Sequence, residues 1–65
     1  MNIKNLKLIK NIFERSIKSI DKLIKIYEDI DNTDDEKILN KLYEKKEEQE
    51  GAFLYQLLKL KNLGD

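Results

Sequence analysis

The segment IDNTDDEKI, residues 30–38, decides the fold because it separates two long stretches of helical pattern. Thr33 stands three residues before Glu36, which is the spacing of a capping box. Asp34 and Asp35 follow the threonine, where the positive end of a helix dipole favours acidic side chains. The segment therefore predicts that one helix ends before it and that a second helix starts at residue 34, capped by Thr33.

Upstream of this segment, apolar residues recur at alternating spacings of three and four, as in an amphipathic helix. This stripe is wider than the seam of a two-stranded coiled coil, and it is typical of a helix that faces the core of a bundle. With Asn2 as its cap, the first helix is predicted over residues 3–30. The stripe consists of Leu6, Ile9, Phe13, Ser16, Ile20, Leu23, Tyr27 and Ile30, flanked by Ile3, Ile17 and Ile24.

Downstream, the polar octet EKKEEQEG, residues 44–51, separates two apolar patches. Apart from Gly51, which costs about 1 kcal/mol relative to alanine, the octet consists of good helix formers. We predict one continuous helix over residues 34–62; the alternative is a break at Gly51 that gives three helices. The patches are Ile38, Leu39, Leu42 and Tyr43, then Ala52, Phe53, Leu54, Tyr55, Leu57, Leu58, Leu60 and Leu63.

A short connection makes the two helices antiparallel, so the predicted fold is an all-α helical hairpin, a single domain of residues 1–65. The octet then lies opposite residues 14–21. We interpret it as helix surface that faces water, with a hinge at Gly51 as one alternative and a loose cation site as another. That site would use Glu44, Glu47 and Glu48, and these acids with Glu50 are also placed to pair with Arg15, Lys18 and Lys22.

The composition argues against most chemical functions. The 65 residues include 13 basic and 13 acidic side chains, no cysteine and no histidine. This balance argues against a generally basic nucleic-acid-binding surface, and the residue types predict no enzyme activity, cofactor, metal site or small-molecule substrate. No apolar run approaches the roughly 18 residues of a membrane span, so a cytoplasmic protein without membrane contact is expected. Abundant Lys, Ile and Asn are typical of an AT-rich bacterial or phage genome.

The open end of the hairpin is more apolar than one neighbouring helix can cover. Such a patch exceeds what monomers normally expose, so a second chain is expected to bury it. The predicted interface consists of Leu8, Ile12, Phe53, Leu54, Leu57, Leu58 and Leu60.

The distribution of charge favours an antiparallel arrangement of two chains. Residues 28–36 carry six acids and no base, whereas Lys4, Lys7, Lys10, Lys59 and Lys61 lie near the other end of the hairpin. Two hairpins packed antiparallel bring unlike charges together. The sequence therefore predicts a homodimer that forms a four-helix bundle with crossing angles of about 20°; half of a heteromer is the alternative.

These features favour a small protein-interaction module, such as a regulator, inhibitor or adaptor, with an unidentified protein partner. The alternative is RNA binding. In length, hairpin plan and acidic turn, the layout resembles the Rop family of RNA-binding four-helix dimers, although its residues do not match the RNA-binding face of that family. In this alternative, a partly basic outer edge of the first predicted helix contacts phosphates. The edge consists of Lys4, Lys7, Asn11, Lys18, Lys22 and Lys25.

Overall fold

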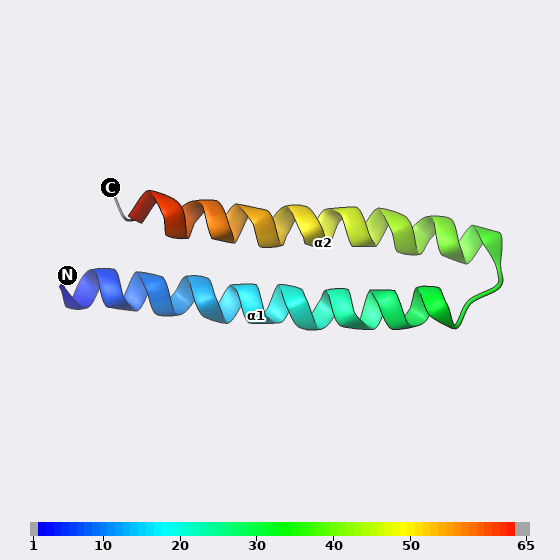
Figure 1. The fold of residues 1–65 in the computed structure, drawn as a ribbon, viewed down its shortest axis with the longest axis horizontal. Helices are drawn as coiled ribbons and strands as arrows, with labels where there is room; N and C mark the ends of the chain where they lie inside the picture. The colour runs from blue at the N-terminus through cyan, green and yellow to red at the C-terminus, as the bar shows by residue number, and fades with distance from the viewer. Residues whose placement is uncertain (1, 64–65) are drawn as a thin grey trace.

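The computed structural model describes residues 2–63, which form two helices packed antiparallel (Figure 1). Helix α1 spans Ile3–Asp31 and α2 spans Glu36–Leu63. The Cα atoms extend over 50 × 16 × 11 Å, with the start of α1 and the end of α2 at one end of the rod and the turn at the other. The predicted all-α hairpin is confirmed, and each helix begins and ends within two residues of the predicted limit.

The predicted cap of α1 is also confirmed. Asn2 lies in extended conformation, and its side-chain Oδ1 accepts a hydrogen bond from the Asn5 N–H at 2.8 Å. This bond satisfies one of the four amides that the first turn of a helix leaves without a partner. At the other end of α1, the Asn32 N–H donates to the Glu28 and Asp29 carbonyls at 3.2 and 3.3 Å.

The predicted capping box at the start of α2 is wrong. The helix begins at Glu36, and the Asp35 side chain accepts a hydrogen bond from the Lys37 N–H at 2.9 Å, so Asp35 is the cap. The Thr33 N–H instead donates to the Ile30 carbonyl at 3.4 Å and closes the turn. Aspartate is at least as good a cap as threonine. With Asp35 as the cap, the helix starts two residues later than predicted, and this leaves the chain room to turn.

Substitution at these two positions tests the assignment. Asp35→Ala is expected to lower the free energy of unfolding by about 1 kcal/mol, because the Lys37 amide loses its acceptor. Thr33→Ala is the matched control and is expected to change it by less than about 0.5 kcal/mol. Urea denaturation followed by circular dichroism measures the free energy of unfolding of both variants. A larger loss of stability in the Thr33 variant than in the Asp35 variant would show that Thr33 caps the helix.

The polar octet is part of a continuous α2, as predicted, and the chain does not break at Gly51. Most of its side chains are exposed; Lys46, Gln49 and Glu50 are half-buried. A Cβ atom built on Gly51 meets no neighbour within 4 Å, and no glycine in the described residues has a positive φ. Neither a close helix approach nor backbone conformation therefore requires a glycine there.

Gly51→Ala is accordingly expected to raise the free energy of unfolding by about 1 kcal/mol, because alanine loses less backbone entropy in a helix. The increase is measured by urea or thermal denaturation under identical conditions for both chains. A loss of stability would mean that the octet bends or approaches another surface at this residue.

The packing between the helices is a narrow seam with few large apolar side chains. Only Ile12, Ile26 and Leu42 are buried apolar residues, at 6%, 9% and 8% exposure, and no described side chain is completely buried. The buried or half-buried helix positions, spaced three and four apart, are Asn5, Ile9, Ile12, Ser16, Ser19, Leu23, Ile26 and Ile30 in α1, and Leu39, Leu42, Lys46, Gln49, Phe53, Gln56, Leu60 and Leu63 in α2, with Glu50 and Lys59 beside them.

Three further buried residues of the seam are polar: Ser16, Ser19 and Gln56. The Ser16 hydroxyl donates to the Ile12 carbonyl at 2.8 Å, within its own helix. Leucine or isoleucine at these positions would bury more apolar surface. The seam between α1 and α2 therefore buries only a small part of the large apolar side chains in the described residues.

The predicted apolar stripe of α1 is only partly covered by α2. Ile9, Leu23 and Ile30 of the stripe lie at the seam with Ser16. The remaining stripe residues, Ile3, Leu6, Phe13, Ile17, Ile20, Ile24 and Tyr27, are exposed. A single neighbouring helix covers only a narrow stripe, so the outer part of a wide stripe stays open.

Candidate interaction surface

One side of α1 presents a row of large apolar side chains to solvent, interrupted by Lys10 between Leu6 and Phe13. The residues of this row follow each other at spacings of three, seven, four, three, four and three, so they lie on one side of the helix. Phe13 is 52% exposed and Ile17 57% exposed, although side chains of this type normally lie inside a protein. The row consists of Ile3, Leu6, Phe13, Ile17, Ile20, Ile24 and Tyr27.

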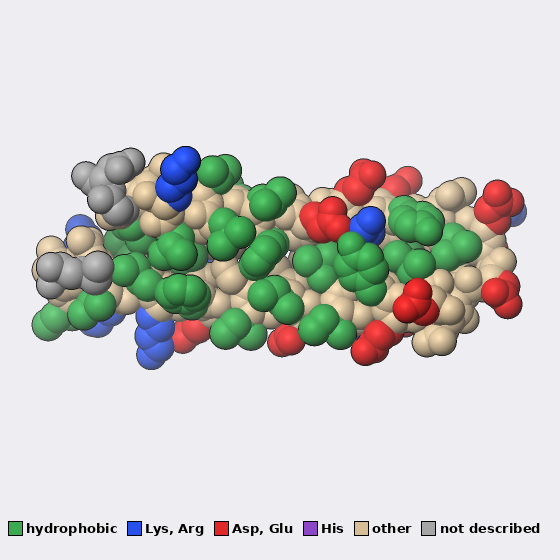
Figure 2. Space-filling model, in the orientation of Figure 1, with side chains coloured by type: hydrophobic (Ala, Val, Ile, Leu, Met, Phe, Trp, Pro, Cys, Tyr) green, Lys and Arg blue, Asp and Glu red, His purple; other side chains and the backbone are tan. Residues whose placement is uncertain are grey.

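Helix α2 extends this row on the same side of the hairpin. The Tyr27 hydroxyl of α1 donates to Glu50 Oε1 at 2.9 Å, and Tyr43 and Leu57 lie one heptad on either side of Glu50. Figure 2 shows hydrophobic side chains of both helices along most of this side. We call this surface the apolar face; it consists of the seven residues of the α1 row together with Tyr43, Leu54 and Leu57.

A polar cluster interrupts the apolar face in its half nearer the turn. Lys46 Nζ lies 3.8 Å from Glu50 Oε1, 5.4 Å from the centroid of the Tyr27 ring and 5.9 Å from that of Tyr43. The charges of Lys46 and Glu50 thus compensate each other, and the tyrosine hydroxyl satisfies the same carboxylate. A cluster that is already paired in this way costs less to cover with apolar surface than a lone charge does.

The two ends of the hairpin carry opposite charge. Residues 28–36, which we call the acidic turn, hold six carboxylates and no base, and acidic side chains are visible at that end in Figure 2. At the other end, Lys4, Lys7, Lys10, Lys59 and Lys61 form what we call the basic end. Because the hairpin is 50 Å long, each charge cluster lies beyond the range over which the other acts in physiological salt.

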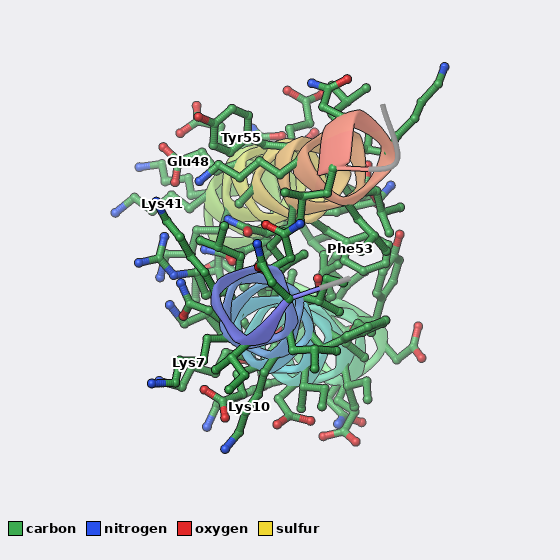
Figure 3. The ribbon with its side chains drawn as sticks, turned by 90° about the vertical axis from the view of Figure 1, so that its left-hand side faces the viewer. Lys7, Lys10, Lys41, Glu48, Phe53 and Tyr55 are labelled. Atoms are coloured by element: carbon green, nitrogen blue, oxygen red, sulfur yellow. The ribbon has the colours of Figure 1, made fainter. Side chains whose placement is uncertain are left out.

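The predicted interface residues do not all lie on one surface. Leu54 and Leu57 are on the apolar face; Leu8 and Leu58 are exposed elsewhere. Ile12 is buried in the seam, and Phe53 and Leu60 are half-buried there. Figure 3, a view along the helices, shows Phe53 on one side of the hairpin, with Tyr55, Glu48 and Lys41 on the opposite side.

The predicted interface lacks the α1 part of this surface, because Leu8 and Ile12 were its only α1 residues. The wide stripe that contains Phe13, Ile17 and Ile20 was predicted to face the core of a bundle, and in the single hairpin these residues are exposed. The width of the stripe, which exceeds what one neighbouring helix covers, was the signal that could have placed them at the interface.

The predicted ion pairs between the helices are not formed. Within residues 2–63 the only ion pair is the one between Lys46 and Glu50, both in α2. Over the same residues, no group of three or more acidic side chains is arranged to hold a metal ion, so the suggested cation site of Glu44, Glu47 and Glu48 is not formed. The octet is best described as exposed helix surface with one paired cluster.

The residues of the RNA-binding alternative are all exposed on α1: Lys4, Lys7, Asn11, Lys18, Lys22 and Lys25. Their spacings of three, four, seven, four and three place them on one side of the helix, turned away from the apolar face. Glu14 and Asp21 are also exposed on α1, which reduces the positive charge along it.

Neither described helix has a stretch long and apolar enough to cross a membrane. Comparison with known protein families, characterised proteins and solved structures finds no match for this chain. The assignment of the apolar face therefore rests on exposure, spacing and charge.

Proposed function

We propose that this chain is a small, non-enzymatic protein-interaction module that works as a homodimeric four-helix bundle joined through the apolar face. One observation carries the proposal: of the fourteen large hydrophobic side chains that are exposed in the described residues, ten lie together on the apolar face, whereas three are buried in the seam. Soluble monomers rarely leave a contiguous apolar patch of this kind open. Two hairpins stacked face to face convert it into a bundle core.

Charge supports an antiparallel stacking of the two copies. In that arrangement the acidic turn of each copy lies beside the basic end of the other, and unlike charges meet at both ends. A parallel stacking places two acidic turns side by side, with six carboxylates each. The paired cluster of Tyr27, Lys46 and Glu50 then lies within the interface without an unpaired charge.

A second candidate, RNA binding, is supported by one observation. Lys4, Lys7, Lys18, Lys22 and Lys25 are exposed on a side of α1 that dimerisation leaves open. A charged surface of this type binds phosphates, and its affinity falls steeply as the salt concentration rises.

Subunit capture tests the proposal. The chain is co-expressed in two forms, one with an affinity tag and one without, and the tagged form is captured from a nuclease-treated lysate. With equal expression, untagged chain is expected to be recovered in about half the amount of the tagged chain, because the two forms pair at random. A tagged chain carrying Phe13→Glu is the control and is expected to recover none.

Two results contradict the proposal. Absence of untagged chain in the capture shows that the apolar face does not bind a second copy. Recovery of untagged chain from an untreated lysate, but not from the nuclease-treated one, shows that RNA holds the copies together and favours RNA binding by the exposed lysines of α1.

A further inference from the structure

A groove lies between the helices at the open end of the hairpin, on the side opposite the apolar face. Its α1 residues Leu8 and Arg15 lie about 160° round the helix from Leu6 and Phe13. The volume of the groove is about 340 Å³. It is lined by Leu8, Asn11, Ile12, Arg15, Gln56, Lys59, Asn62 and Leu63.

Among the described residues that line this groove, the charges all have one sign. Arg15 and Lys59 are the ionised residues of this set, and none of the set is a carboxylate. The Lys59 ammonium lies 4.6 Å from the centroid of the Tyr55 ring. The neighbouring groove nearer the turn differs, because Asp29 and Glu48 accompany its three lysines. The groove at the open end is therefore the one suited to an anion.

Gln56 supplies a second, independent feature of the groove. Its side chain is only 9% exposed, and its Oε1 atom has no hydrogen-bond partner in the described structure. A buried acceptor without a donor is destabilising, so a turn of the Gln56 side chain that brings Oε1 to an N–H group in the groove is favoured. Beside it, Leu8, Ile12 and Leu63 provide apolar surface.

We propose that this groove binds the C-terminal end of a peptide whose last residue is apolar. The last residue of such a peptide has one group for each of these features of the groove. Its carboxylate pairs with Arg15 and Lys59, its backbone N–H donates to Gln56 Oε1, and its side chain packs on the apolar residues. Arginine is suited to the carboxylate because its planar fork donates two parallel hydrogen bonds.

This proposal goes beyond the function proposed above and rests on it only because the dimer stabilises the hairpin that carries the groove. The groove and the apolar face lie on opposite sides of the hairpin, so a dimer keeps two grooves open. Arg15→Gln and Gln56→Leu leave the apolar face unchanged, so loss of peptide binding by a variant that stays dimeric is distinguishable from loss of dimerisation.

Fluorescence anisotropy with the full chain tests the proposal. The probe is a fluorescein-labelled pentapeptide, Gly-Ser-Gly-Ser-Leu, with a free C-terminal carboxylate; the matched probe is the same peptide with an amidated C-terminus. The amidated peptide is expected to bind at least about tenfold more weakly, because it cannot pair with Arg15 and Lys59 as an anion. Equal binding of the two peptides, or no binding of either, overturns the proposal.

Three variants assign the contacts. Arg15→Gln is expected to weaken binding of the free-carboxylate peptide about tenfold, and Gln56→Leu about fivefold. Gln56→Leu is also expected to raise the melting temperature, which shows that its loss of binding does not come from unfolding. Lys45→Gln, in the neighbouring groove, is the control and is expected to change binding less than about twofold. Unchanged binding in the Arg15 variant overturns the proposal.

Discussion

A chain carrying Ile17→Glu together with Ile20→Glu is expected to be monomeric and to lose most of its helix content. Both side chains are exposed in a single hairpin, at 57% and 40%. In the proposed dimer they are buried, and each contributes about 1.5–3 kcal/mol, to which the cost of burying a carboxylate is added. The free energy of unfolding is expected to fall by more than about 4 kcal/mol, a large part of the stability of a small domain. Circular dichroism measures the helix content, and sedimentation measures the mass.

A control with the same number of introduced acids separates the interface from general charge effects. Lys18→Glu with Lys25→Glu changes two exposed residues of the same helix that lie outside the apolar face. The expected change in the free energy of unfolding is less than about 1 kcal/mol. If the isoleucine variant is as stable as this control, the hairpin folds alone and the apolar face has no partner.

Leu42→Ala is the second substitution with a large expected effect. Leu42 is one of three buried apolar side chains in the seam. Truncation removes its transfer free energy and leaves a cavity, which together cost about 2–4 kcal/mol. Because so few residues form the seam, urea denaturation at a fixed chain concentration is expected to show a strongly reduced midpoint.

The matched control for this prediction is Ile38→Ala, one turn earlier in α2. Ile38 is 48% exposed, so its truncation is expected to cost less than about 1 kcal/mol. Equal effects of the two substitutions would mean that the helices pack through different residues from those of the described seam.

Much of the fold could be predicted from the sequence because its signals are local. Asn2 before one apolar pattern and the aspartates before the other mark the two helix starts, and residues 32–35 leave room only for a tight turn. The capping residue of α2 was misplaced because Thr33, Asp34 and Asp35 are all residues that cap helices. Only the geometry of the turn distinguishes them.

The side of α1 that packs on α2 was harder to predict from the sequence. Three residues belong both to the predicted stripe and to the observed seam: Ile9, Leu23 and Ile30. The apolar pattern is therefore compatible with two orientations of α1 about its own axis, which differ by part of a turn. The buried serines, Ser16 and Ser19, give no apolar signal, although small side chains let two helices approach closely. The sequence therefore indicated that a wide apolar surface exists, and the structure located the part of it that α2 does not cover.

Sedimentation equilibrium of the unmodified chain, at low micromolar concentration and physiological salt, tests the central claim most directly. The account predicts a single folded species with twice the 7.8 kDa mass of one chain. Dilution is expected to reduce the helix content together with the mass, because the hairpin and the dimer stabilise each other. A stably helical particle of 7.8 kDa at that concentration would contradict the account, because the apolar face would then be open to water in a folded monomer.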